Sequence, residues 1–410
     1  MMAFCRFCAA PLGHVFVDLG TTPLANAYLA PTREAIAAEQ RFPLRVMVCD
    51  RCLLVQVEEA VPAETVFPAD YAYLSSYADS WLAQCRAYAG KMIARLGLGS
   101  RSLVVEIASN DGYLLQFFVE RGVPVLGIEP AAHAAELARA KGVPSEVLFF
   151  NRDTAPALAA RGVAADLMPA NNVLAHVPDI GGFVAGFPVL LKPEGVATFE
   201  FPHLLNLIRG VQFDTIYHEH YSYLSLVAVE RVLASAGLRV FDVEKLPSHG
   251  GSLRLFVCRR EASFAEETAV AALRAEEAAA GLDRPAGYDG FAPRVETVKA
   301  GFRRFLAAAR AEGKRIAAYG AAAKGNTFLN VCGATADDIL FVVDRNPEKQ
   351  GRLLPGSHVP VRPPEALYEV RPDYVLILPW NLADEIRAHH AAIADWGGRF
   401  VTAVPEIRIY

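Results

Sequence analysis

The sequence predicts an α/β protein in which a small N-terminal metal-binding domain precedes two Rossmann-like domains. Three observations support this prediction: two Cys-x-x-Cys pairs near the N-terminus, alternating helix-like and strand-like stretches from about residue 80, and a second strand-turn-helix-strand pattern from residue 315. Strands that alternate with helices are typical of a parallel, doubly wound sheet. A chain of 410 residues suits about two or three domains, and we expect them to span residues 1–75, 76–290 and 291–410.

The composition excludes several classes of protein. Hydrophobic residues make up 53% of the chain and charged residues 21%, which allows sizeable cores and leaves little room for long disordered tracts. The formal net charge of -5 lacks the basic excess of a nucleic-acid binder. Apolar stretches are too short to span a membrane, and the N-terminus lacks the apolar core of a signal peptide. We therefore expect a cytoplasmic protein with no nucleic-acid, membrane or obligate protein partner.

Four of the seven cysteines form two closely spaced pairs. In a reducing compartment, such pairs bind metal more often than they form disulfides. Four thiolates complete a tetrahedral zinc site that has no open position for water, which predicts a structural zinc ion. Four ordinary buried or redox-active thiols are the alternative. The predicted ligands are Cys5, Cys8, Cys49 and Cys52, whereas Cys85, Cys258 and Cys332 are expected to fill the core.

The apolar pattern predicts the order of elements in the two larger domains. In the central domain we expect helices at residues 80–96 and 113–121, and strands at 102–107, 123–128, 165–168, 195–201 and 254–258. A helical stretch then extends to about residue 282, and a link containing Pro and Gly at 285–293 is expected to be a connector. In the C-terminal domain we expect a strand at 315–320, a helix at 322–331 and a strand at 339–344.

The two larger domains open with a similar spacing. Glu106 and Glu129 lie 23 positions apart, and Gly320 and Asp344 lie 24 positions apart. A weak internal duplication would explain this. The favoured alternative is that any two Rossmann-like openings share the spacing, because a turn, a helix and a return strand occupy it.

The segment Glu106-Ile-Ala-Ser-Asn-Asp-Gly112 follows a strand and opens a helix. Small residues and backbone N–H groups at such a turn allow a cofactor to approach closely, and a carboxylate at the end of the next strand can bind ribose hydroxyls. Because no Gly-x-Gly-x-x-Gly is present, S-adenosylmethionine is favoured over a dinucleotide; a purely structural turn is the alternative. The candidate cofactor residues here are Glu106, Ala108, Asn110, Asp111, Gly112 and Glu129.

A second polar segment, Asn171-Asn172-Val-Leu-Ala-His176, follows the strand predicted at 165–168. It lies at the carboxyl edge of the sheet, where ligands of open α/β sheets collect. Asn171, Asn172 and His176 are therefore candidates to face the cofactor. A lone histidine at such a corner is more often a hydrogen-bonded structural residue.

The densest polar cluster runs from Asp214 to Tyr223 and contains two histidines, one glutamate and three tyrosines. Tyr217 and His220 share a face in helical geometry, and Glu219 is placed to orient an imidazole or to bind a substrate hydroxyl. The spacing of the two histidines differs from the His-Glu-x-x-His of zinc proteases, which favours a catalytic base over a metal ligand. Either His218 or His220 fits that role, and a structural polar turn is the alternative.

Two glycine-containing runs are candidates for contacts with a sugar or an anion: His249-Gly-Gly-Ser-Leu-Arg254 and Tyr319-Gly-Ala-Ala-Ala-Lys-Gly-Asn326. Glycines let backbone N–H groups reach phosphate oxygens, and each run carries one cation that can neutralise a diphosphate. Ordinary tight turns with solvated cations are the alternative. The candidate substrate residues are Ser252, Arg254, Tyr319, Lys324 and Asn326.

Taken in order, these motifs resemble those of the sugar C-methyltransferases of the tetronitrose and mycarose type, which act on nucleotide-linked 4-keto deoxysugars. The resemblance covers nearly the whole chain, and Ala108 departs from it because the family has Gly at that position. It implies an N-terminal zinc-binding domain, a central S-adenosylmethionine-binding domain and a C-terminal Rossmann-like domain, with the sugar nucleotide between the last two. It also implies a thymidine diphosphate-linked substrate that is methylated next to the keto group, at C-3.

The resemblance further implies roles for individual residues. An imidazole of the Tyr-His-Glu-His motif removes a proton beside the 4-keto group, and the enolate attacks the methyl sulfonium; His220 matches this base. Around the sugar, the matching residues are Tyr71, His176, Tyr217 and Glu219, with Tyr73 and Tyr77 as alternatives to Tyr71. This chemistry needs a well-placed base and a stabilised oxyanion but no catalytic metal. The competing functions are O- or N-methylation of a sugar or small metabolite, and non-enzymatic binding of a sugar nucleotide.

Overall fold

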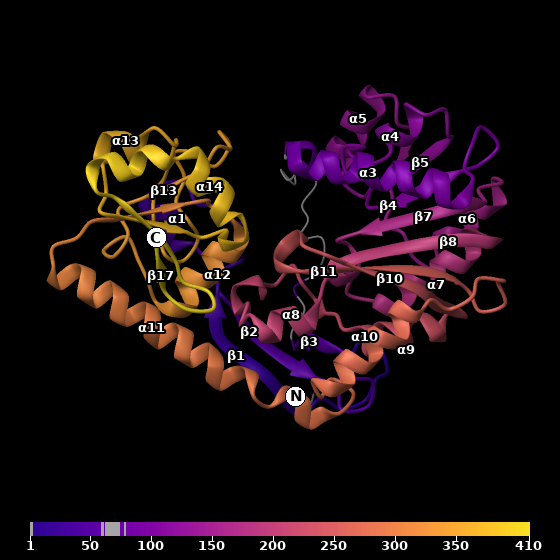
Figure 1. Cartoon of the computed structure of the whole chain (residues 1–410), viewed down its shortest axis with the longest axis horizontal. Helices are drawn as coiled ribbons and strands as arrows, with labels where there is room; N and C mark the ends of the chain where they lie inside the picture. The colour runs from indigo at the N-terminus through magenta and orange to yellow at the C-terminus, as the bar shows by residue number, and fades with distance from the viewer. Residues whose placement is uncertain (1–2, 59–60, 62–73, 78) are drawn as a thin grey trace.

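The computed structural model describes residues 3–58, 61, 74–77 and 79–410. Its strands form three sheets of four, seven and six strands. Figure 1 shows the two larger sheets in separate halves of the molecule, with the N-terminal strands between them at one side. The predicted α/β architecture is therefore present.

The four-stranded sheet has the order β1-β2-β3-β9 and is antiparallel. Its last strand comes from the central part of the chain, so that Tyr223 pairs with Val55. On the other side, Phe16 stacks on Phe291 with ring centroids 4.5 Å apart. The sheet is thus joined through Tyr223 to the central part of the chain and through Phe291 to the C-terminal half. Its strands are β1 (His14–Thr22), β2 (Phe42–Val48), β3 (Val55–Val57) and β9 (Ser222–Tyr223), and the short helix α1 (Arg33–Ala37) lies between β1 and β2.

The seven-stranded sheet has the order β10-β11-β8-β7-β4-β5-β6. The predicted parallel arrangement holds from β8 to β6, but β11 is antiparallel to both β8 and β10. The reason is that β10 and β11 are joined by a short turn, whereas a parallel connection needs about a dozen residues or more. The strands are β4 (Val104–Ile107), β5 (Val125–Ile128), β6 (Ser145–Glu146), β7 (Ala165–Asn171), β8 (Leu191–Pro202), β10 (Leu238–Leu246) and β11 (Ser252–Arg259).

Helices surround this sheet, and two of the predicted elements differ in extent. The helix expected at 113–121 is reduced to α4 (Gln116–Val119), because the turn that contains Gly112, with φ of +76°, continues into the following residues. The link expected to end at 293 ends earlier, since Pro293 lies in the first turn of α11 (Phe291–Ala311), where its missing N–H has no partner to lose. The other helices are α3 (Asp79–Leu96), α5 (Ala132–Ala140), α6 (Ala155–Ala160), α7 (Ile180–Leu190), α8 (Leu204–Arg209), α9 (Leu226–Ser235) and α10 (Thr268–Ala279).

The six-stranded sheet has the order β14-β13-β12-β15-β16-β17, with only the last pair antiparallel. The turn after its first strand in the chain makes the same contact as the turn after β4 in the central sheet. Asp344 accepts a hydrogen bond from the backbone N–H of Ala321, and Glu129 accepts one from that of Asn110, each at 2.8 Å. The elements are β12 (Ile316–Tyr319), α12 (Ala323–Cys332), β13 (Val342–Val343), β14 (Val361–Arg362), α13 (Ala366–Val370), β15 (Tyr374–Ile377), α14 (Ala383–His389), β16 (Arg399–Thr402) and β17 (Arg408–Ile409).

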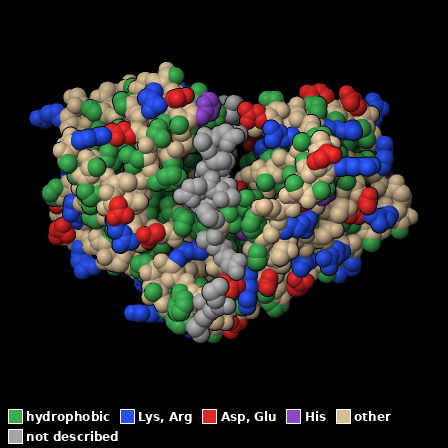
Figure 2. Space-filling view, turned by 180° about the vertical axis from the view of Figure 1, so that it is seen from behind, with side chains coloured by type: hydrophobic (Ala, Val, Ile, Leu, Met, Phe, Trp, Pro, Cys, Tyr) green, Lys and Arg blue, Asp and Glu red, His purple; other side chains and the backbone are tan. Residues whose placement is uncertain are grey.

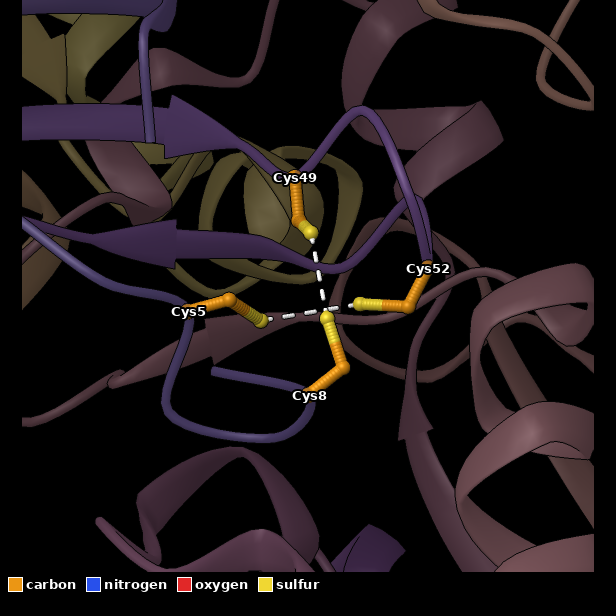
Figure 3. A group of neighbouring side chains, drawn as sticks. All are labelled: Cys5, Cys8, Cys49 and Cys52. Atoms are coloured by element: carbon orange, nitrogen blue, oxygen red, sulfur yellow. Dashed lines mark hydrogen bonds between the residues drawn. The ribbon is translucent and has the colours of Figure 1, made fainter. Parts of the chain in front are cut away.

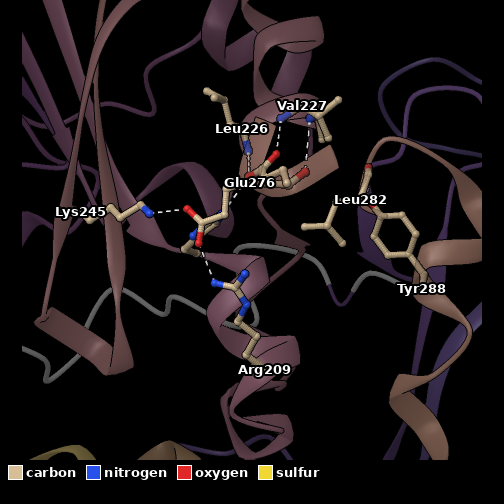
Figure 4. A network of polar contacts seen from close by, with 11 residues as sticks. Arg209, Leu226, Val227, Lys245, Glu276, Leu282 and Tyr288 are labelled. Atoms are coloured by element: carbon tan, nitrogen blue, oxygen red, sulfur yellow. Dashed lines mark hydrogen bonds and ion pairs between the residues drawn. The ribbon is translucent and has the colours of Figure 1, made fainter. Parts of the chain in front are cut away.

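Two neighbouring glutamates of α10 bind other elements of the central domain, just before the chain passes to the C-terminal half (Figure 4). Glu277 is buried and accepts hydrogen bonds from the first backbone N–H groups of α9, at Leu226 (2.7 Å) and Val227 (2.9 Å). Glu276 forms ion pairs with Arg209, at 2.6 Å, and with Lys245. A carboxylate at a helix N-terminus satisfies N–H groups that otherwise lack a partner, so α10 is held firmly against α9.

The surface carries no obvious single-signed patch on the face that Figure 2 shows, where basic and acidic side chains are interspersed among the described residues. Among the helices that the structure describes, none is long and apolar enough to cross a membrane. Both observations agree with the balanced charge and the short apolar stretches of the sequence.

Candidate active site and metal centre

The four predicted cysteine ligands converge at one point (Figure 3), and their sulfur atoms all lie within 4.8 Å of one another. The Cys5 and Cys52 sulfurs are 3.6 Å apart, and those of Cys8 and Cys49 are 3.5 Å apart. Tetrahedral zinc with Zn–S bonds of about 2.3 Å requires sulfurs roughly 3.8 Å apart. The thiols are free, and the Cys52 thiol stabilises the Cys5 thiolate, which lowers the pKa of Cys5 to about 4. The donor set therefore fits a closed zinc site.

The turn after β4 is held in a conformation that brings its backbone close to the sheet edge. Ala108 and Asn110 have φ of +58° and +48°, a left-handed region that strains alanine but not glycine. Glu106, just before the turn, is fully buried beside Tyr113, and burial raises its pKa well above the usual value. A β-carbon on Gly112 would lie 3.2 Å from Ala138 of α5. The turn is thus packed tightly enough to keep its strained shape.

Glu129 closes this turn from the end of β5. Its two carboxylate oxygens accept backbone N–H groups of Asn110 (2.8 Å) and Ala131 (2.9 Å), and burial raises its pKa. Each oxygen retains acceptor capacity, because a carboxylate oxygen accepts more than one hydrogen bond. The predicted ribose-binding carboxylate is therefore fixed at the edge where β4 and β5 end.

Several buried polar atoms at the same edge make no hydrogen bond within the described part of the chain. Leaving such an atom without a partner costs about 1–3 kcal/mol, so a group of them indicates a polar ligand. Lys141 binds only one carboxylate oxygen of Asp111, at 2.8 Å. The atoms without a partner are Ser109 Oγ, Asp111 Oδ1, Asn171 Oδ1 and Asn172 Oδ1.

His220 has a defined tautomer. Its Nδ1 lies 2.8 Å from the carbonyl oxygen of Thr215, and because a carbonyl can only accept, Nδ1 carries the proton and Nε2 carries the lone pair. The ring packs against Tyr217 at a centroid distance of 4.0 Å. Burial, together with the nearby His176, lowers the pKa of His220 well below 6.5, so the imidazole is neutral at physiological pH.

His176 is arranged in the same way. Its Nδ1 donates to the backbone carbonyl of Glu219 at 2.8 Å, and its ring centroid lies 4.7 Å from that of His220. Burial lowers its pKa to about 4. The two imidazoles come from distant segments of the chain and form one neutral pair.

Glu219 has a partner that the sequence did not indicate. The Asn26 amide nitrogen lies 2.8 Å from each of its carboxylate oxygens. Burial raises the pKa of Glu219 to about 7, and the bond from Asn26 opposes this shift. No motif marks Asn26, because its contact depends on how the loop after β1 meets a segment almost 200 residues later.

His218 lies apart from this pair. Its Nε2 donates to the backbone carbonyl of Pro43 at 3.0 Å, and its ring contacts Phe42 of β2. Tyr71 and Tyr73 lie outside the described residues, and the backbone of Tyr77 belongs to a short 3-10 helix. Of the predicted acceptor residues, the structure brings together His176, Tyr217, Glu219 and His220.

Lys324 lies in the first turn of α12 and contacts two residues of the C-terminal half. Its Nζ donates to Asn381 at 2.8 Å and lies over the Trp380 ring, 5.0 Å from its centroid. The Trp380 indole N–H donates to Asp214 at 2.7 Å. Burial raises the pKa of Asp214 to about 6, and Lys324 opposes that shift. These contacts join the C-terminal half to the segment that bears His220.

The other predicted substrate residues have internal partners. Arg254 is buried, pairs with Glu200 at 2.6 Å and covers the ring of Tyr88. Ser252 donates to the carbonyl of Ser248 at 3.0 Å. Asn326 donates to the carbonyl of Ala25 at 2.6 Å, and Tyr319 packs against His390 in a separate apolar cluster. The structure therefore does not bring Tyr319 to the imidazole pair.

Three family models and one curated relative together cover nearly the whole chain. Three family models match in sequence: "Putative zinc binding domain" at residues 5–67, "Methyltransferase domain" at 81–243 and "C-methyltransferase C-terminal domain" at 247–405. The first match contains the four-cysteine cluster and confirms the predicted zinc-binding domain. C-methyltransferase NovU of Streptomyces niveus is 37% identical over 405 residues, which are 99% of this chain and 96% of that protein.

Two more distant similarities concern parts of the chain. The ubiquinone biosynthesis O-methyltransferase of Rhodopseudomonas palustris (strain BisA53) is 26% identical over 156 residues, covering 33% of this chain and 62% of that protein. The solved structure of the magnesium protoporphyrin IX methyltransferase of Synechocystis PCC 6803, with bound SAM, shares 14% identity at a TM-score of 0.34, covering 43% of this chain and 79% of that chain. A likeness at that score supports no conclusion about this chain.

Proposed function

The chain belongs to the C-methyltransferase family and is a methyltransferase, and from this premise we propose that it methylates a nucleotide-linked 4-keto deoxysugar. S-adenosylmethionine is the donor, and the methylated carbon is C-3, next to the keto group. A thymidine diphosphate-linked sugar is the substrate that the family resemblance implies. The observation that carries the proposal is the neutral pair of His176 and His220, each with its Nδ1 bound to a backbone carbonyl.

The edge formed by β4, β5 and β7 suits the donor. Glu129 offers acceptor capacity to ribose hydroxyls, and the turn from Ala108 to Gly112 offers close backbone approach to the methionine portion. The buried polar atoms of Ser109 and Asn171 supply partners for its polar groups. When bound, S-adenosylmethionine supplies the electrophilic methyl group that the substrate carbon accepts.

His220 acts as the general base. Its Nε2 lone pair takes the proton from the carbon beside the ketone, and the electron pair of that C–H bond remains on the substrate as an enolate. Because burial lowers its pKa, the resting imidazole is neutral and ready to accept a proton. The imidazolium is then stabilised by the negative enolate and by Glu219 when that carboxyl group is ionised.

Two neighbours support the enolate and its alignment. The Tyr217 ring lies against His220, and we assign its hydroxyl group to donate a hydrogen bond to the developing oxyanion. Lys324 acts electrostatically on His220, and we assign its charge to the diphosphate. Arg254 already has a carboxylate partner, and its role is to fix Glu200 and the adjoining hairpin.

The zinc ion has a structural role, because four thiolates leave it no open position. Its site lies at the turn between β2 and β3, and β3 pairs with β9 directly after the motif that contains His220. Loss of the metal would therefore disturb the base indirectly. Four reduced thiols suit the cytoplasm, where we place the protein.

Exchange of deuterium from solvent into the sugar tests the proposed chemistry. The enzyme is incubated in D₂O with a thymidine diphosphate 4-keto-6-deoxysugar, without donor, and the ring carbons are followed by NMR. We expect exchange at C-3. Absence of exchange together with methyl transfer to oxygen or nitrogen would indicate O- or N-methylation instead. The similarity to an O-methyltransferase is the reason to test for this activity. Absence of donor binding in calorimetry would indicate a binding protein.

A further inference from the structure

The turn between β10 and β11 holds a histidine in a strained conformation. His249, Gly250 and Gly251 have φ of +56°, +88° and +111° in succession. Packing explains the two glycines, since a β-carbon on Gly250 would lie 2.6 Å from the Trp380 side chain and one on Gly251 would clash with Asn206. A histidine in the left-handed region is uncommon, and such strain collects at functional sites.

His249 lies between the two parts of the proposed site. On one side, its ring meets Trp81 of α3 at a centroid distance of 6.2 Å, and Trp81 contacts Tyr113, directly after the donor turn, at 5.9 Å. On the other side, Gly250 approaches Trp380, which is bound to Asp214 of the base segment. The histidine is therefore at the junction of the donor edge and the acceptor residues.

The turn is anchored so that the ring position is defined. Ser248 donates to one carboxylate oxygen of Glu200 at 3.1 Å, and Arg254 binds the other at 2.6 Å. Glu200 is fully buried and pairs in register with Asn171, one of the residues with an unsatisfied polar atom at the donor edge. The contacts of Ser248 and Arg254 with Glu200 thus fix the turn that carries His249, and Glu200 connects this turn to the donor edge.

The imidazole of His249 is available to a ligand. It is exposed, and its ring makes no hydrogen bond with any residue that the structure describes. Burial among the neighbouring residues, together with Lys324 and His176, lowers its pKa to about 4, so the imidazole is neutral at physiological pH. The accessible ring therefore lies at the junction of the donor edge and the base segment. A neutral imidazole there offers one N–H donor and one acceptor nitrogen.

We propose that His249 binds the acceptor through a hydrogen bond to an uncharged oxygen, a hydroxyl or carbonyl group of the sugar ring, at the junction of the donor and base sites. This proposal rests on the proposed function and assigns one specific contact to His249, where the sequence indicated only that its run contacts a sugar or an anion. A neutral ring beside Lys324 adds no attraction for a phosphate, so the sugar oxygen is the chemical group that it fits.

Two substitutions test the proposal without straining the turn. His249→Asn and His249→Gly both accept a positive φ, so neither should lower the melting temperature. We expect each to weaken binding of the thymidine diphosphate 4-keto-6-deoxysugar about tenfold in calorimetry, and to raise the KM of deuterium exchange with a smaller change in kcat. Binding of S-adenosylhomocysteine should remain unchanged.

His358→Asn is the matched control, because His358 also has a left-handed φ, of +55°, but lies in the C-terminal half and contacts Glu39 of the N-terminal domain. It should leave sugar-nucleotide binding unchanged. Unchanged binding in both His249 variants would overturn the proposal, as would failure of the parent chain to bind the sugar nucleotide. If the parent chain binds it but shows no exchange at C-3, the proposed reaction fails, while the binding role of His249 is still decided by calorimetry.

Discussion

The amide nitrogen of Asn26 lies 2.8 Å from both carboxylate oxygens of Glu219. The loop that carries Asn26 also provides the carbonyl of Ala25, which accepts a hydrogen bond from Asn326 of α12. One loop of the N-terminal domain thus contacts the base segment and the C-terminal half. The zinc-binding domain therefore contributes directly to the proposed active site.

Replacing Asn26 should change the pH dependence of proton abstraction. Burial raises the pKa of Glu219 to about 7 and Asn26 lowers it, so Asn26→Ala should raise it further. Under the proposed role of the ionised carboxylate in stabilising the His220 cation, we expect exchange to increase with pH through about 7 in the parent chain and at higher pH in the variant. The measurement is the rate of deuterium exchange between pH 5.5 and 9.

Glu219→Gln is the control for this assignment, because it removes the titrating group. Its exchange rate should be lower, by roughly tenfold, and should lose the rise through pH 7. If the exchange rate of Glu219→Gln still rises through pH 7 as it does in the parent chain, a group other than Glu219 is titrating.

Much of the fold could be predicted because its apolar strands are marked in the sequence. The strands β4, β5, β7 and β12 lie within or overlap the predicted stretches, and the two cysteine pairs converge as their spacing predicts. The antiparallel hairpin of β10 and β11 was not predicted, because the apolar pattern of a buried strand does not reveal the direction of its neighbour.

The site was predictable only where residues are adjacent in the chain. The motif around Tyr217 and His220 is dense enough to stand out, whereas Asn26 and Trp380 reach it from distant segments. Arg254 is a residue that the sequence marks as functional but that has a structural partner. The sequence marks it as a free cation, but the pairing of β8 with β11 places Glu200 opposite it and neutralises its charge.

Removing the carboxylate of Glu129 should weaken donor binding. In Glu129→Ala, the ribose hydroxyls lose their acceptor, and the turn loses the bond to the N–H of Asn110. We expect the Kd of S-adenosylhomocysteine in calorimetry to increase at least about tenfold. An unchanged Kd would place the donor elsewhere. Asp344→Ala, which removes the equivalent carboxylate of the C-terminal half, is the control and should leave the Kd unchanged.

Glycine at position 108 should relieve strain. Ala108 adopts a φ of +58°, which costs alanine about 1–2 kcal/mol relative to glycine, partly offset by the greater freedom of glycine in the unfolded chain. Ala108→Gly should therefore raise the free energy of unfolding by up to about 1 kcal/mol, measured by urea denaturation, with donor binding retained. A loss of stability would contradict this, and Ala132→Gly, in helix α5, should be destabilising for comparison.

The four-cysteine cluster should bind one zinc ion per chain. Metal analysis of protein purified without chelator should find zinc in the parent chain, and Cys5→Ser or Cys49→Ser should lose it together with several kcal/mol of stability. Cys332→Ala serves as the control, because that thiol is buried far along the chain in α12 and should not affect zinc content. Full stability of both serine variants, or no zinc in the parent protein, would refute a structural metal.

Replacing each histidine in turn with asparagine decides which one is the base. His220→Asn should lose deuterium exchange by about 100-fold or more while still binding donor and sugar nucleotide, because only the group that accepts the proton is removed. His218→Asn should have a mild effect, since that ring bonds to Pro43 and faces β2. His176 is the informative competitor, because its ring lies 4.7 Å from His220 and has the same tautomer. Exchange that persists in His220→Asn and vanishes in His176→Asn would transfer the role of the base to the neighbouring ring, with proton abstraction itself unchanged.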